Sequence, residues 1–120
     1  MPTKRQDSDR VALLQGTLDL LILKTLVLGP HHGQGMARTI QRQSEDAFSV
    51  DHGSLYLALQ RLEDKGWITG RWGASENNRR ARFYTLTRQG RAQLGEKATE
   101  WRKLARAIAL ILGPELGEAD

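Results

Sequence analysis

The sequence predicts a mainly α-helical fold with one small β-hairpin, and three observations support it. Residues 54–65 place apolar side chains at helical spacing and are followed by glycine, the usual residue just past a helix end. Residues 67–75 and 80–86 read as two strands joined by an asparagine turn at 76–79. A heptad pattern then runs nearly to the C-terminus. Such an order is typical of a winged helix-turn-helix with a long C-terminal dimerisation helix.

Positive charge is concentrated in the region of the hairpin. The chain has 120 residues, enough for one domain plus a long terminal helix, with 18 Lys and Arg against 14 Asp and Glu. The stretch from Asn77 to Gly95 contains arginines but no acid. Clustered positive charge attracts a polyanion, most often nucleic acid, although such a run can also be a solvated surface.

Several classes of site are excluded by residue types and spacing. The chain has no cysteine, which excludes disulfides, thiolate metal sites and thiol switches. His31 and His32 are adjacent without a third ligand nearby, so we expect no metal and no cofactor. No Ser/His/Asp or paired-carboxylate arrangement stands out, so we do not expect an enzyme.

The first predicted helix covers residues 11–28 and follows a polar arm at 1–10 that we expect to be flexible. Gly29 and Pro30 stop the helix. Its apolar residues occupy two sides, and the second burial surface can be another subunit. The apolar run is broken by charged residues and too short to span a bilayer, and no secretion signal opens the chain, so we expect a cytoplasmic protein without a membrane partner.

Two further helices complete the predicted core. The first covers residues 35–43, and the second, over 54–65, is capped by Asp51 or Ser54. Their apolar side chains recur at helical spacing and predict one buried face on each helix. The residues predicted to point inward are Met36, Ala37, Ile40, Leu55, Leu59 and Leu62.

The face of the 54–65 helix opposite its apolar side is the candidate base-reading surface. Its polar side chains can hydrogen-bond base edges, and Arg61 suits guanine. Tyr56 can either reach a phosphate or border the core. Arg79 and Arg80 fall at the wing tip, over the backbone or a minor groove, whereas Arg82 can also face inward. The predicted DNA-binding residues are Ser54, Tyr56, Leu57, Gln60, Arg61, Arg79, Arg80 and Arg82.

The last predicted helix, residues 88–113, starts after a Thr87 cap and precedes an acidic tail at 114–120. At about 1.5 Å per residue it is roughly 35 Å long, which favours dimerisation over packing within one small domain. Its heptad seam is joined by apolar residues of the first helix. The predicted dimer interface is Leu20, Leu23, Val27, Leu94, Ala98, Trp101, Ala105, Ile108 and Leu112.

Three segments resemble the PadR family of bacterial transcriptional regulators: T-L-D-L-L-I-L-K-T-L, H-G-S-L-Y-L-A-L-Q-R-L-E-D-K-G-W-I and Y-T-L-T-R-Q-G-R. The resemblance covers residues 14–112 and departs from the family pattern at Gln34, Ser54 and Leu57. It implies a homodimer that represses transcription at an inverted repeat and is released by a small effector, often aromatic. Trp101 matches a position where some relatives stack their ligand, and its alternative role is packing in the seam.

These observations predict an arm at 1–10, a DNA-binding domain at 11–87, a dimerisation helix at 88–113 and a tail at 114–120. The predicted function is sequence-specific binding of double-stranded DNA at a pseudo-palindromic operator. The alternative is a winged-helix module that docks a protein or RNA partner. Salt dependence and preference for paired half-sites separate the two.

Overall fold

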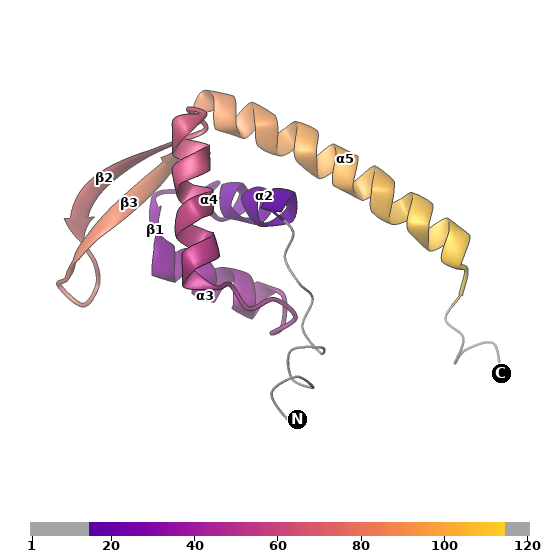
Figure 1. The fold of residues 1–120 in the computed structure, drawn as a ribbon, viewed down its shortest axis with the longest axis horizontal. Helices are drawn as coiled ribbons and strands as arrows, with labels where there is room; N and C mark the ends of the chain where they lie inside the picture. The colour runs from indigo at the N-terminus through magenta and orange to yellow at the C-terminus, as the bar shows by residue number, and fades with distance from the viewer. Residues whose placement is uncertain (1–14, 115–120) are drawn as a thin grey trace.

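The computed structural model describes residues 15–114 (Figure 1). Its elements are, in order, α2 (Gln15–Thr25), β1 (His31–His32), α3 (Gly33–Gln43), α4 (His52–Asp64), β2 (Ile68–Ala74), β3 (Arg80–Leu86) and α5 (Arg88–Leu112). They confirm the predicted fold class. The predicted arm at 1–10, the start of the first helix at 11–14 and tail residues 115–120 lie outside the described residues. No helix in the described part of the chain is long and apolar enough to cross a membrane.

Helix α2 lies at the centre of the helical layer and packs against α3, α4 and α5. Ile22 and Leu23 are fully enclosed. The prediction that this helix continues to residue 28 was wrong, because α2 ends at Thr25. The amide of Leu26 donates to the Leu23 carbonyl at 3.2 Å, the first of several i−3 bonds that tighten the chain before Gly29, which has a φ of 149°.

Helix α4 buries one continuous face in this core. Leu55, Ala58, Leu59 and Leu62 are all buried, at the spacing that puts one stripe on a helix. Met36 of α3 belongs to the same core cluster, Ile40 is also buried, and the partly buried Ala37 packs against the cluster. The predicted inward faces of α3 and α4 are therefore confirmed.

The wing is part of a three-stranded antiparallel sheet in the order β1-β3-β2. Strands β2 and β3 pair from Ile68 opposite Leu86 to Ala74 opposite Arg80. The predicted turn is confirmed, and Asn78 adopts a φ of 57°, a conformation that asparagine tolerates. Strand β1 was not predicted, because two residues are too few to show strand periodicity.

Helix α5 begins at the predicted Thr87 cap, whose hydroxyl accepts the Gly90 amide at 3.0 Å and donates to the Gly66 carbonyl at 2.7 Å. The first turn of α5 therefore lies directly against the start of the wing. Beyond it the helix runs past α2, and its yellow C-terminal end extends away from the other elements (Figure 1). Within residues 15–114, only the first part of α5 is thus covered by its own chain.

We predict opposite stability effects for alanine at two glycines of α5. At Gly90 a methyl group would collide with the Trp67 carbonyl and stand 2.8 Å from its carbon atom, so Gly90→Ala should lower the free energy of unfolding by about 1–3 kcal/mol. At Gly95 nothing lies within 4 Å, so Gly95→Ala should raise it by about 0.5–1 kcal/mol. Urea unfolding at one fixed protein concentration measures both. Stabilisation by both substitutions would show that the Gly90 contact does not constrain the fold.

Candidate nucleic-acid interface

Helix α4 is held at its N-terminus by the Asp51 cap, one of the two caps predicted. The Asp51 carboxylate accepts the Ser54 amide at 2.9 Å and the Ser54 hydroxyl at 3.1 Å. These hydrogen bonds, the backbone one first, lower the pKa of Asp51 below its ordinary value. The Ser54 hydroxyl donates to the cap, so it faces a ligand mainly as an acceptor.

Four of the predicted DNA-binding residues share the exposed side of α4: Ser54, Tyr56, Leu57 and Gln60. Tyr56 is 52% exposed and Leu57 is 61% exposed. Tyr56 therefore lies at the surface and not in the core, which was the alternative for this residue. An exposed leucine beside polar side chains matches what a base-reading helix presents, because apolar groups contact the thymine methyl.

Arg61 lies elsewhere than predicted. Its Nη2 donates to Asp19 of α2 at 2.9 Å, and Asp19 is buried. The prediction that Arg61 is free on the exposed face of α4 is therefore corrected, because an ionised carboxylate inside the core needs this partner. Arg61 instead ties the candidate recognition helix to the central helix.

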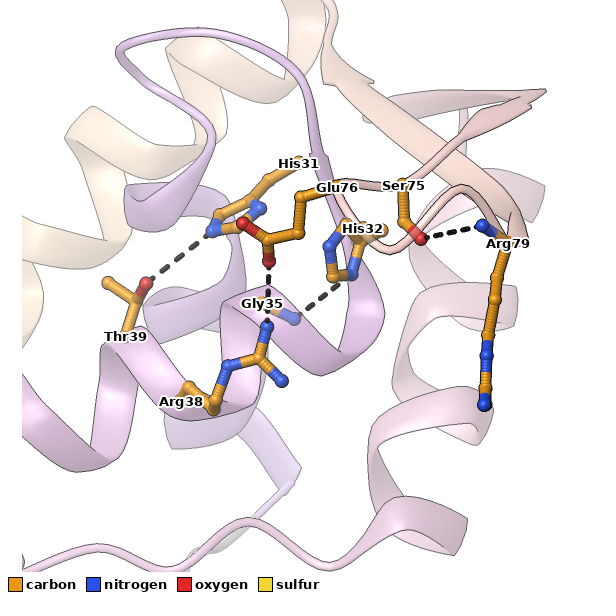
Figure 2. A network of polar contacts seen from close by, with 8 residues as sticks. All are labelled: His31, His32, Gly35, Arg38, Thr39, Ser75, Glu76 and Arg79. Atoms are coloured by element: carbon orange, nitrogen blue, oxygen red, sulfur yellow. Dashed lines mark hydrogen bonds and ion pairs between the residues drawn. The ribbon is translucent and has the colours of Figure 1, made fainter.

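The wing tip carries two arginines without an ion pair to any described residue, Arg79 and Arg80. The Arg79 amide donates to the Ser75 hydroxyl at 3.3 Å, which closes the turn and leaves the Arg79 guanidinium exposed (Figure 2). The Arg80 guanidinium lies 4.4 Å from the centroid of the Trp72 ring, a cation–π distance. Both arginines are therefore accessible to an anion, and Arg80 rests on an aromatic surface.

Arg82 points inward, the second of its two predicted alternatives. Its Nη2 donates to Glu63 of α4 at 2.6 Å, and its guanidinium lies 5.9 Å from the Tyr84 ring. The hydrogen bond to Glu63 raises the pKa of Arg82, and burial raises the pKa of Tyr84. Arg82 thus fixes the wing to α4 and is only partly available to a ligand.

The wing, α3 and the start of α4 enclose a cleft of about 460 Å³. Its lining includes Arg38, Tyr56, Trp72, Arg79, Arg80 and Arg82. Among the described residues that line the cleft, Glu76 is the one acid. Arg38 and Trp72 were not predicted as site residues, although the hairpin register places Trp72 opposite Arg82 and diagonal to Arg80. The cleft combines positive charge with aromatic surface, which suits a nucleic-acid backbone.

His32 lines the cleft, and both His31 and His32 contact helix α3 (Figure 2). His32 caps α3, since its Nδ1 accepts the Gly35 amide at 3.1 Å. His31 lies 3.4 Å from the Thr39 hydroxyl, and burial, with smaller effects of His32 and Arg38, lowers its pKa. Across residues 15–114, no three His, Cys, Asp or Glu side chains gather where they could hold a metal ion.

The predicted dimer surface divides into covered and uncovered parts. Leu23 is 0% exposed inside its own chain, so it is not free for a partner and its prediction is corrected. Leu94 packs partly against the same core and remains half-exposed, so its predicted place in the interface stays a prediction. Trp101 and Ile108 are exposed on α5. Leu20 and Val27 are half-buried on α2 and its following turn, and Ala98 and Ala105 are half-buried on α5. The exposed large apolar residues on the outer half of α5 are Leu104, Ile108, Leu110, Ile111 and Leu112.

Comparison with known proteins finds relatives over most of the chain. A family model described as the transcriptional regulator PadR-like family matches residues 22–96. A PadR family transcription regulator from Clostridium difficile is 31% identical, with 80% of this chain and 98% of that chain covered and a TM-score of 0.68. A transcriptional regulator from Clostridium thermocellum is 26% identical, with 82% and 96% covered and a TM-score of 0.74. An uncharacterized protein from Lysinibacillus sphaericus is 27% identical over 103 residues, 86% of this chain and 94% of its own.

We predict that the Asp19–Arg61 pair stabilises the fold. Asp19→Asn removes the charge while keeping the shape, and should lower the free energy of unfolding by about 1–3 kcal/mol because Arg61 loses its charged acceptor. Asp64→Asn, on the exposed end of α4, is the matched control and should change it by no more than about 0.5 kcal/mol. Chemical denaturation compares the two. Equal, small effects would mean that the pair does not hold α4 in place.

Proposed function

Because this chain belongs to the PadR-like family of transcriptional regulators, we propose that it represses transcription by binding a pseudo-palindromic DNA operator as a homodimer. The observation that carries this proposal is the continuity of two surfaces. The exposed side of α4 meets the arginine-lined cleft at Tyr56, so the proposed base-reading and backbone-binding groups adjoin each other there.

Each part of that surface has a distinct task in the proposal. Leu57 and Gln60 face base edges in the major groove, where apolar and amide groups distinguish base pairs. Arg79 and Arg80 contact the backbone beside the groove without reading sequence. Trp72 holds Arg80 in position, because the stacked guanidinium has fewer orientations to lose on binding.

The proposed dimer forms through the apolar outer half of α5. Ile111 is 84% exposed in the single chain, and Leu104, Ile108 and Leu112 on the same side of the helix are also uncovered. Monomeric soluble proteins rarely leave such a contiguous apolar surface in water. Pairing two copies of α5 through the heptad seam buries Trp101, Ala105, Ile108 and Leu112, and relates two α4 helices by a twofold axis.

We infer an aromatic effector site in the space between α2 and α5. A cleft of about 310 Å³ there is lined by Thr17, Leu20, Lys97, Glu100, Trp101 and Leu104. The indole offers a stacking surface, while the Lys97 ammonium suits an anionic substituent. Since α2 also contacts α4, a ligand in this cleft can alter the spacing of the two recognition helices.

The experiment that tests operator binding is selection of sites from random duplex DNA at near-physiological salt. We expect an enriched inverted repeat with half-sites about 34–36 Å apart. Ile108→Glu should break the dimer and weaken binding to the full repeat by at least about a hundredfold, because each half-site then binds alone. Ala107→Glu adds the same charge outside the seam and should bind normally. No enriched duplex from a stable dimer, or salt-independent binding to RNA or protein instead, would contradict the proposal.

We predict that a planar aromatic acid quenches Trp101 fluorescence and weakens operator binding. By linkage, operator DNA should weaken binding of that compound by the same factor. Because Trp67 and Trp72 also fluoresce, Trp101→Phe shows which part of the fluorescence change comes from Trp101. A screen of such compounds that leaves both fluorescence and operator affinity unchanged would eliminate the effector site and leave Trp101 as a packing residue.

A further inference from the structure

The arginines that line the basic cleft differ in their ion-pair partners, and Arg82 is already paired with Glu63 of α4. Arg79 and Arg80 on the wing have no ion pair with a described residue. Arg38, on the α3 wall, faces Glu76 at the wing tip. Glu76 is the only acid in the sequence between Lys65 and Glu96. The Glu76 carboxylate is therefore the one negative charge among the described residues that line this positively charged cleft.

Arg38 and Glu76 form a bridge across the cleft. Nη2 of Arg38 lies 3.4 Å from Oε1 of Glu76, and the two side chains are 59% and 73% exposed. In Figure 2 the Arg38 guanidinium is directed at the Glu76 carboxylate, while Arg79 extends away from both. Both bridge residues also line the cleft.

This bridge contributes little to folding. Exposed ion pairs are screened by water and salt, and their contribution to stability is small. The pair therefore opens easily when another anion approaches. A nucleic-acid backbone presents a row of phosphates. When Arg38 leaves the Glu76 carboxylate and binds one of them, cations condensed on the nucleic acid are released, which favours binding.

We propose that Arg38 is an additional phosphate-binding residue and that Glu76 competes with DNA for it. In the free protein the Glu76 carboxylate is paired with the Arg38 guanidinium. When the DNA backbone enters the cleft, a phosphate displaces the Glu76 carboxylate from Arg38. Glu76 thereby lowers affinity for every duplex, which limits retention on non-operator DNA. The inference rests on the proposed DNA-binding function.

The location of Arg38 supports this role. It lies on the exposed side of α3, the first helix of the helix-turn-helix, which crosses the DNA backbone when the second helix enters the major groove. The guanidinium is a fork of donors that matches phosphate oxygens. A contact to phosphate carries no sequence information, so its loss should affect operator and random duplex alike.

The test is a double-mutant cycle in the full-length protein, with affinity measured over a series of salt concentrations. Arg38→Gln should weaken binding to operator and to random duplex by the same factor, about five- to tenfold, and reduce the salt slope by about 0.9. Glu76→Gln should tighten binding about three- to fivefold, the scale of one exposed ion pair. In the Arg38→Gln background, Glu76→Gln should change affinity by less than about twofold, because the competed group is gone.

Matched controls are Arg106→Gln and Glu96→Gln on α5, which change the net charge identically and should leave the salt slope unchanged. Thermal unfolding checks that each variant folds.

Equal gains in affinity from Glu76→Gln with and without Arg38 would overturn the competition, since Glu76 would then act only by general repulsion. An unchanged salt slope for Arg38→Gln would overturn the phosphate contact. If the wild type binds no duplex, the proposed function falls together with this inference, whereas operator binding with an unaffected Arg38→Gln removes this inference alone.

Discussion

Burial of one face of α4 is the constraint on which the rest of the site depends. Leu55, Leu59 and Leu62 are enclosed by the core, and each removes apolar surface from water worth about 1.5–3 kcal/mol. A helix turns about 100° per residue, so fixing that stripe directs Leu57 and Gln60 to solvent. The outward face therefore follows from the inward one.

Three polar attachments complete the positioning of α4. Asp51 caps its first turn, Arg61 binds Asp19 of α2, and Glu63 binds Arg82 of β3. The last two sit two residues apart on α4 and point to different elements, so the helix is fixed relative to both the core and the wing. A rigid base for the exposed residues reduces the entropy lost on binding.

The arginines of the molecule fall into two groups. Arg61 and Arg82 form ion pairs with carboxylates of the same chain, whereas Arg79 and Arg80 at the wing tip form no ion pair with a described residue. Counting basic residues along the hairpin therefore overstates the charge available to a ligand. At the other end of the chain, α5 exposes large apolar residues that the core leaves uncovered, so the arginine-lined cleft and this apolar surface lie on separate elements.

The sequence by itself determined the element types, because their signals are local. Helical spacing over 54–65, the asparagine turn and the Thr87 cap each depend on neighbouring residues, and the structure confirms the helix, the hairpin and the start of α5.

The tertiary structure alone decided which partner each polar group takes. Asp19 and Arg61 are 42 residues apart, and no periodicity links them. The tertiary structure also decided β1, which forms a strand because it pairs with β3. It decided the environment of Leu23 as well: α2 is apolar on two sides, and Leu23 is buried in the core. Contacts between distant segments depend on how whole elements pack, and a short window of sequence contains no record of that packing.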